Sequence, residues 1–236
     1  MSRILTIFLF IALNSCATGW QYTKVPLDSI KFEKLENLDS VKAVGNLRME
    51  GTFGKFSGTI LLATKGSMFR LEIFHKIGKV VLAVVGNSKK IVAINFNDGQ
   101  KKIYLDKKIP LFGSISIPVE LIQSLVTGKV PPLGTIKRAW KQNEMIIVQV
   151  ENPNIKLIFN KSLKNIQFFD KYSDKVEILL NPQFVGNVGE HVRSVEIRFK
   201  SGKAWIDWFR VATSQLLPDD YFEYDKMFEM DSVLAN

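Results

Sequence analysis

The 236-residue chain is poor in the residue types on which much protein chemistry depends, since it contains one cysteine and two histidines. A single cysteine excludes an internal disulfide, so an apolar core has to stabilise the folded chain. The spacings of a zinc site are absent, as are a Gly-x-Ser-x-Gly elbow and a phosphate-binding loop. The sequence therefore predicts a protein that is not an enzyme and that needs no metal or cofactor.

The few remaining candidates for chemistry are isolated. His75 falls in a predicted turn, and His191 stands between Glu190 and Arg193 before a strand, a position typical of a solvent-facing side chain. Asp219 and Asp220 are adjacent carboxylates, which alone are weak evidence for a cation site. None of these residues belongs to a recognisable catalytic or metal-binding pattern.

Long hydrophobic runs are also lacking, because the longest apolar stretch, residues 4–13, is shorter than the about 20 residues of a membrane-spanning helix. Arg3 precedes this stretch and Leu13-Asn14-Ser15-Cys16 follows it, a pattern typical of a secretory signal. The last four residues resemble the lipobox of bacterial lipoproteins, although Asn14 is unusual there. We predict that the Cys16 thiol is lipidated; the alternative is an ordinary signal peptide with a cysteine near its cleavage site by chance.

We predict four parts in the chain: a signal peptide (residues 1–15), a lipid anchor and linker (16–26), one domain (27–217) and a C-terminal tail (218–236). Two or more acyl chains hold a protein stably at a membrane. Ala17 follows the cysteine, which resembles the lipoproteins sorted to the outer membrane, so we expect an anchored protein that faces the periplasm.

The net charge of +9 at pH 7 comes from basic residues scattered along the chain without a basic block. Such scattering is typical of solvated strand faces rather than of a nucleic-acid groove, and export makes nucleic acid an unsuitable partner. The charge indicates a soluble surface that also suits anionic headgroups.

Alternation of apolar and polar residues predicts β-strands along most of the chain. A helix is expected at residues 27–41, where the apolar spacing is three and four. A second helix is expected at 117–128, with Pro118 in its first turn and Gly128 at its end. The turns between strands include Asn97-Asp98-Gly99 and Ser201-Gly202. The expected strands lie at 47–49, 56–62, 69–73, 80–85, 91–96, 103–105, 135–141, 145–150, 155–159, 166–169, 176–180, 192–200 and 205–211.

Short strands joined by tight turns favour an antiparallel meander. An integral outer-membrane barrel needs strands of about 9–11 residues with a continuous lipid-facing band, and lysines and turns interrupt these strands. The predicted fold is therefore mainly β: an unclosed antiparallel barrel, or strongly curved sheet, with an N-terminal helix and a mid-chain lid helix. The tail from Pro218 shows no period, and it either caps the sheet or stays mobile.

The order of these elements resembles the outer-membrane lipoprotein receptor LolB and its soluble relative, the periplasmic carrier LolA. The resemblance rests on Val44-Gly45-Asn46-Leu47, Phe69-Arg70-Leu71, the turn His75-Lys76-Ile77-Gly78, and the segment Ile117-Pro118-Val119-Glu120-Leu121 that leads to Thr127-Gly128. It covers about residues 27–211, and its motifs are loose and mostly apolar.

What the resemblance implies is a monomer that takes the acyl chains of a lipoprotein from a LolA-type carrier and helps to place them in the outer membrane. In that family a loop projects an apolar residue towards the membrane, and Ile77 holds the matching position between Lys76 and Lys79; a turn residue packed on its neighbours is the alternative. Candidates for the acyl-chain cavity are apolar residues of the early strands and the lid, which would look the same in a sealed core: Leu47, Met49, Ile60, Leu62, Phe69, Leu71, Ile73, Ile122 and Leu125.

A related function stays open: an envelope lipoprotein of the same fold that binds another lipid, or that scaffolds an envelope complex without transfer. The segment Trp205-Ile206-Asp207-Trp208-Phe209 fits a partner surface of such a scaffold. The same segment also fits a strand that packs alternate aromatic residues into the core.

Overall fold

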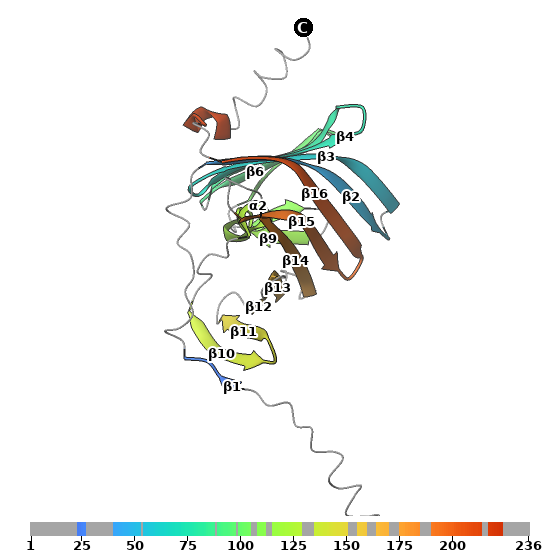
Figure 1. Cartoon of the computed structure of the whole chain (residues 1–236). Coiled ribbons are helices and arrows are strands. Elements are labelled where there is room, and N and C mark those ends of the chain that lie inside the picture. The colour runs from blue at the N-terminus through green and yellow to red at the C-terminus, as the bar shows by residue number, and fades with distance from the viewer. Residues whose placement is uncertain are drawn as a thin grey trace, which may run out of the picture.

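One long antiparallel sheet, curled around its own apolar face, makes up most of the protein (Figure 1). We used a computed structural model, which describes residues 23–26, 40–52, 54–87, 89–97, 99–104, 108–111, 115–128, 135–150, 155–159, 164–169, 175–184, 190–213 and 217–223. The sheet has 14 strands, and a separate two-stranded hairpin lies inside its curve. The predicted fold class, a mainly β, unclosed and strongly curved sheet, is confirmed.

The strands follow the predicted segments closely, and several are longer than predicted. The large sheet contains β1 (Thr23–Lys24), β2 (Val41–Gly51), β3 (Gly54–Lys65), β4 (Met68–His75), β5 (Val80–Gly86), β6 (Ile91–Asn95), β7 (Gln100–Tyr104), β10 (Ile136–Gln142), β11 (Met145–Val150), β12 (Lys156–Phe159), β13 (Lys164–Phe169), β14 (Lys175–Phe184), β15 (Glu190–Phe199) and β16 (Gly202–Thr213).

The sheet is a meander with one long-range join. Strands β2 to β7 pair in chain order, as do β10 to β16, and β16 then pairs with β2 so that the two halves become one sheet. Its edges are β1, which pairs with β10, and β7. Tight turns with Gly99 at φ 67° and with Ser201-Gly202 connect neighbouring strands where the sequence predicts them. The predicted meander is confirmed.

Alternation along each strand decides which side chains face the inside of the curve. In β2, Ala43 and Leu47 are buried while Asn46 and Arg48 between and beside them are exposed. Register shifts in four strand pairs, one of them between Trp208 and Arg210 of β16, add local twist to the sheet. This twist suits a long sheet whose apolar face is turned inward.

The predicted helix at 117–128 is wrong in its first half. Ile117 and Pro118 belong to strand β9 (Ile115–Pro118), which pairs with β8 (Lys108–Leu111) in a hairpin. A 3-10 turn, η3 (Val119–Leu121), and one short helix, α2 (Ser124–Thr127), follow. Pro118 has an extended ψ of 136°, so it ends the strand rather than starting an α-helix. Gly128, at φ 66°, ends α2 as predicted.

The N-terminal predictions are tested only in part. Residues 1–22 and 27–39 lie outside the described residues, and with them Cys16 and most of the predicted helix at 27–41. Val41 is not helical, since it begins β2. Thr23 and Lys24 of the predicted linker form β1, because an extended dipeptide satisfies the open edge of β10 with backbone hydrogen bonds.

The start of the C-terminal tail caps the outer face of the sheet. Leu217 and Phe222 are buried against Ala63 of β3, and the 3-10 turn η5 (Asp219–Phe222) lies between them. Lys65 Nζ donates to the Leu217 carbonyl at 2.8 Å and pairs with Asp219 at 2.7 Å. Of the two sequence alternatives for the tail, capping therefore holds for residues 217–223.

Candidate functional site

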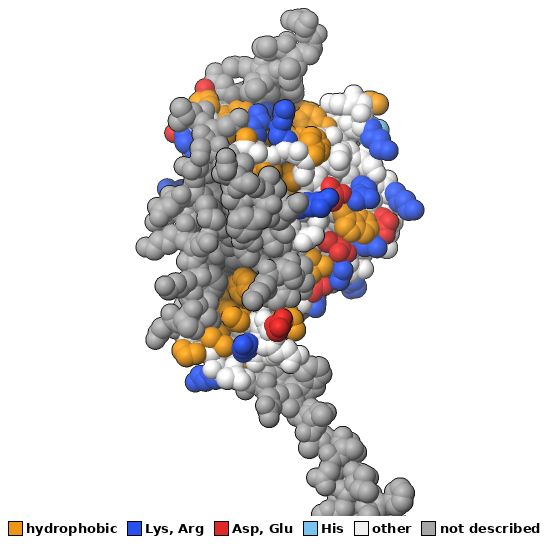
Figure 2. Space-filling view, in the orientation of Figure 1, with side chains coloured by type: hydrophobic (Ala, Val, Ile, Leu, Met, Phe, Trp, Pro, Cys, Tyr) orange, Lys and Arg blue, Asp and Glu red, His pale blue; other side chains and the backbone are white. Residues whose placement is uncertain are grey.

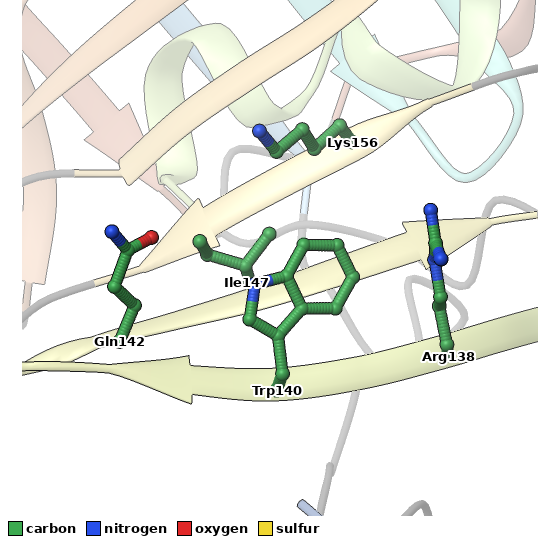
Figure 3. Close-up of a pocket in the computed structure, with 5 residues that line it drawn as sticks. All are labelled: Arg138, Trp140, Gln142, Ile147 and Lys156. Atoms are coloured by element: carbon green, nitrogen blue, oxygen red, sulfur yellow. The ribbon is translucent and has the colours of Figure 1, made fainter. Parts of the chain in front are cut away.

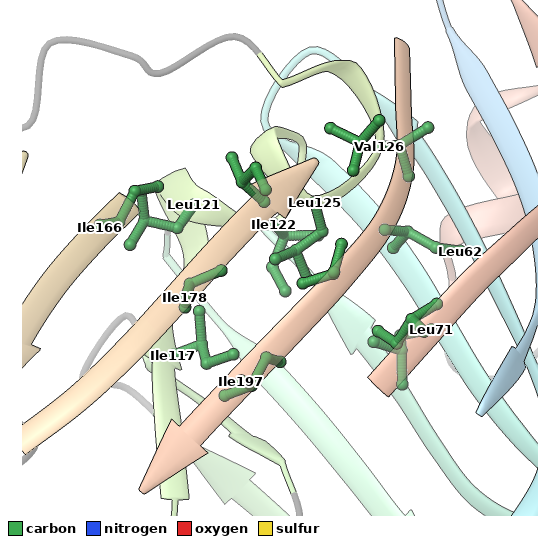
Figure 4. Close-up of a cluster of buried hydrophobic side chains, with 14 of the residues drawn as sticks. Leu62, Leu71, Ile117, Leu121, Ile122, Leu125, Val126, Ile166, Ile178 and Ile197 are labelled. Carbon is green, nitrogen blue, oxygen red and sulfur yellow. The ribbon is translucent and has the colours of Figure 1, made fainter. Parts of the chain in front are cut away.

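The inner face of the sheet is a continuous apolar surface, and the segment from β9 to α2 lies against it. Figure 4 shows side chains of this segment, including Ile122 and Leu125, pointing between the strands of the two halves of the sheet. Ile122 and Leu125 are at most 1% exposed. The segment Ile115–Gly128, which we call the insert, thus occupies the place where the resemblance implies a lid.

Two hydrogen bonds between described residues join the insert to the sheet. The indole Nε1 of Trp208 donates to the Leu125 carbonyl at 2.8 Å, and the Gln123 side-chain amide donates to the Gly66 carbonyl. The other amide atom of that side chain, Gln123 Oε1, is buried without a hydrogen-bond partner. Apolar contact of the buried insert residues adds to this attachment, and such contact is non-directional.

Gly45 makes room for the Trp208 side chain. A Cβ at position 45 would lie 2.8 Å from Cε3 of the Trp208 ring and 2.9 Å from the Asp207 carbonyl oxygen. The two residues are direct partners in the β16–β2 register. A glycine on β2 therefore lets the indole reach across to the insert.

The nine predicted cavity residues all lie on this inner face or on the insert. Eight of them are no more than 3% exposed, and Met49 is partly buried against the same cluster. They pack as a core around the insert, and the side chains of Leu47, Leu71 and Leu125 are fully buried, at 0% exposed. Their role as an acyl-chain lining stays a prediction, and it requires the insert to move.

The predicted membrane-facing residue lies at the tip of the β4–β5 hairpin. Ile77 is 81% exposed, and the lysines on either side of the tip are exposed as well. The turn is closed by backbone hydrogen bonds of 2.8 Å from the His75 amide to Lys79 and from the Gly78 amide to His75. Figure 2 shows a hydrophobic tip above basic side chains at the upper right, where Figure 1 places this hairpin.

The isolated candidates for chemistry remain apart. His75 ends β4 and packs edge-on against Phe56, whereas His191 lies on β15. Asp219 pairs with Lys65. Within the described ranges no three His, Cys, Asp or Glu side chains gather as a metal site would require, and no helix there is long and apolar enough to cross a membrane.

The aromatic segment of β16 serves both faces of the sheet. Ile206 and Trp208 are buried on the inner face, whereas Phe209, at the register shift, is 62% exposed. The alternation predicted that alternate residues pack inward, but it gave no signal that Trp208 holds the insert. The β8–β9 hairpin was also missed, although two alternating runs with a glycine between them in the sequence are a recognisable hairpin signal.

Comparison with known proteins identifies the fold. No protein-family model matches the sequence, and no curated protein matches it. Among solved structures, a putative outer membrane lipoprotein-sorting protein domain from Vibrio parahaemolyticus is similar, with a TM-score of 0.52, 7% identity and coverage of 83% of this chain and 93% of that one.

A DUF1329 family protein from Desulfovibrio piger is similar as well, with a TM-score of 0.50, 9% identity and coverage of 81% of this chain and 92% of that one. At such identities a likeness shows the fold alone. The chain has the LolA/LolB-like fold, which is the one that its sequence resemblance implied.

Proposed function

We propose that this protein is a non-enzymatic envelope lipoprotein that binds acyl chains of lipoproteins on the inner face of its sheet. The observation that carries the proposal is that a short insert packs its apolar side chains against the apolar inner face of the sheet. A hydrocarbon chain offers the sheet the same kind of contact as the leucine, isoleucine and valine side chains of the insert. Displacing the insert therefore exchanges one apolar partner for another.

Hydrophobic transfer provides the driving force for this exchange. An acyl chain that leaves water gains roughly 25 cal/mol for each Å² that it buries, and the inner face needs no catalytic group to provide that gain. The hydrogen bond from Trp208 to Leu125 opposes opening by about 1 kcal/mol, as a typical net value for such a bond. This bond therefore stabilises the form in which the insert covers the inner face, but by an amount that cargo binding can exceed.

The place and partners of the protein follow from the same proposal. Lipidated Cys16 would hold the protein at the outer membrane, facing the periplasm, where a LolA-type carrier would deliver cargo. Ile77, exposed between two lysines, would touch the membrane during release. The lipoprotein-sorting neighbour supports this assignment at the level of fold.

A scaffold of the same fold is the second candidate, and the exposed ring of Phe209 favours it. This side chain is 62% exposed on the outer face of β16, away from the inner face that would hold a lipid. A partner protein that covers Phe209 would leave the insert closed.

The deciding experiment mixes the purified full chain with a fluorescent fatty acid and, separately, with a carrier–lipoprotein complex. Saturable uptake from both supports the receptor. A chain that takes up neither cargo, while still binding an envelope protein, contradicts acyl binding and supports the scaffold.

The role of the insert is tested by Trp208→Phe, with Trp205→Phe as the matched control on the same strand. Trp205 lies on the outer face with Lys203 Nζ 4.5 Å from its ring centroid, so its replacement leaves the insert untouched. Loss of the bond to Leu125 should speed cargo uptake roughly five- to tenfold, since about 1 to 1.4 kcal/mol is removed from the closed form. Equal rates in both variants would show that opening of the insert does not limit uptake.

A further inference from the structure

The outer face of the sheet carries a hollow that the proposed lipid-binding function does not use. It lies over β10, β11 and β12 and has a volume of about 370 Å³. Arg138, Trp140, Gln142, Ile147 and Lys156 line it, and Figure 3 shows the Trp140 ring between Arg138 and Gln142, beside Ile147, with Lys156 on the far side. Trp140 alternates with Ala139, which belongs to the inner core, so this hollow opens on the opposite face.

The charge of the described residues that line the hollow is positive. Among the described residues, neither Arg138 nor Lys156 has a carboxylate oxygen within 4.0 Å. Lys24 of β1 lies directly opposite Trp140 in the register, and since opposed residues share a face, it adds a third basic side chain beside the hollow. Three basic side chains on one face attract an anion.

The Arg138 guanidinium is held in place for such an anion. Its Nε donates to Gln149 Oε1 at 2.6 Å, and its central carbon lies 5.3 Å from the centroid of the Trp140 ring. The terminal Nη atoms are left to donate, and a fixed guanidinium fork suits phosphate or carboxylate oxygens. The position of Arg138 is therefore set before a ligand arrives.

The rest of the hollow suits a compact neutral body attached to the anion. Ile147 is 4% exposed at its base, the indole of Trp140 offers an apolar surface, and the Gln142 amide supplies both a donor and an acceptor. A volume near the lower end of the range for small-molecule sites admits a small ligand rather than a protein segment.

We propose that this hollow is a binding site for phosphate esters of small polyols. Arg138 and Lys156 would hold the phosphate oxygens, and Trp140 and Gln142 would contact the polyol. Two sources offer this chemistry: a soluble phosphomonoester and the phosphodiester headgroup of a membrane lipid.

The position of the hollow favours the lipid headgroup as the source. Strand β1 forms one side of this region, and a fully extended chain from Cys16 to Thr23 reaches at most about 25 Å. A lipidated Cys16 would therefore keep Thr23, at the side of the hollow, within about 25 Å of its lipid anchor, and this choice of source rests on the proposed function. The anion site itself does not.

The test is calorimetric titration of the purified full chain with sn-glycerol 3-phosphate, with glycerol as the uncharged comparison. The double variant Arg138→Gln/Lys156→Gln should bind the phosphate at least tenfold more weakly. The double variant Lys137→Gln/Lys141→Gln is the matched control, because it removes the same charge from exposed lysines of β10 that do not line the hollow. Unchanged thermal unfolding of all variants verifies that they fold.

Binding by the parent chain and the control, but not by the Arg138/Lys156 variant, supports the site. Absence of phosphate binding by the parent chain, or an equal loss in both double variants, overturns it. Tighter binding of glycerophosphoglycerol than of glycerol 3-phosphate assigns the site to a lipid headgroup, and the reverse order assigns it to a soluble phosphomonoester. Neither probe carries an acyl chain, so failure of the acyl-binding proposal leaves this result unaffected.

Discussion

Arg70 and Glu72 form a buried ion pair on the outer face of β4, where their side chains would otherwise meet solvent. They are 4% and 8% exposed, and the guanidinium donates to the carboxylate through both Nε and Nη2. Its Nη1 donates to the Tyr221 carbonyl at 3.2 Å, and the Tyr221 ring lies 4.6 Å from the guanidinium carbon. A buried pair persists only where its remaining hydrogen-bonding groups are satisfied, which here requires the capping segment 217–223.

The same contact predicts a loss of stability at alkaline pH. Burial raises the pKa of the Tyr221 hydroxyl above its ordinary value of 10.0, and the positive charge of Arg70 only partly opposes this effect. The unfolded chain then loses its tyrosine proton first, so the stabilising contribution is complete below pH 10.0 and declines as the pH rises through the folded-state pKa. Thermal unfolding measured from about pH 9 to about pH 11 should show a steeper fall for the parent chain than for Tyr221→Phe.

Both proteins share every other titrating group, so only the difference between their curves reports on Tyr221. Parallel curves across this range would mean that the Tyr221 hydroxyl does not contribute to the pH dependence.

At the scale of elements, the tip of the β4–β5 hairpin exposes one apolar side chain with a basic residue on each side, and we propose that it touches the membrane. Because Ile77 is 81% exposed, Ile77→Glu should leave folding intact. It should lower delivery of lipid cargo to vesicles about tenfold, since a buried isoleucine contributes roughly 1.5–3 kcal/mol and two nearby lysines about 1 kcal/mol each at an anionic surface. Transfer of labelled lipoprotein to anionic vesicles is the measurement.

The matched control is Ile103→Glu, which makes the same change at an isoleucine that is 55% exposed on edge strand β7. Delivery that falls equally in the two variants, or in neither, would remove the special role of the hairpin tip.

The elements that the sequence predicted well are those defined by their own alternation. The long runs of β2 to β4 and of β14 to β16 place apolar residues at alternate positions, so their period alone identifies them. The insert was predicted poorly because its shape depends on what it packs against. Apolar residues from Val119 to Val126 fit a regular helix equally well, whereas the chain forms a 3-10 turn and a short helix there.

At the scale of the whole molecule, the proposed lipidation of Cys16 would decide where the protein works. Cys16→Ala should leave the protein soluble in the periplasm or retained as its precursor, because no other cysteine can carry the lipid. Fractionation of cells that express each form, with mass spectrometry of residue 16 and of co-purifying lipid, measures this outcome. Unchanged membrane retention of the alanine variant would place the anchor elsewhere.

The sequence predicted which residues make up the candidate site, but not whether they form a sealed core or an open cavity. The alternation of β2 to β4 correctly grouped Leu47, Ile60 and Leu71 on one face. Parity alone does not reveal which face turns inward, and it does not distinguish a sealed core from a lipid cavity. The hollow around Trp140 was missed for a related reason, since its basic residues come from different strands and are joined only by register.

The pairing of β2 with β16 has a consequence for how the chain acquires its structure. Arg48 and Asp207, which bond across this pair at 2.8 Å, are 159 residues apart in the sequence. Strand β16 must be synthesised before it can pair with β2. The loop that this pairing closes is therefore among the largest that a chain of this size allows. High contact order of this kind slows folding towards milliseconds or longer. Until β16 pairs with β2, the apolar face of the early strands stays exposed and is prone to aggregation.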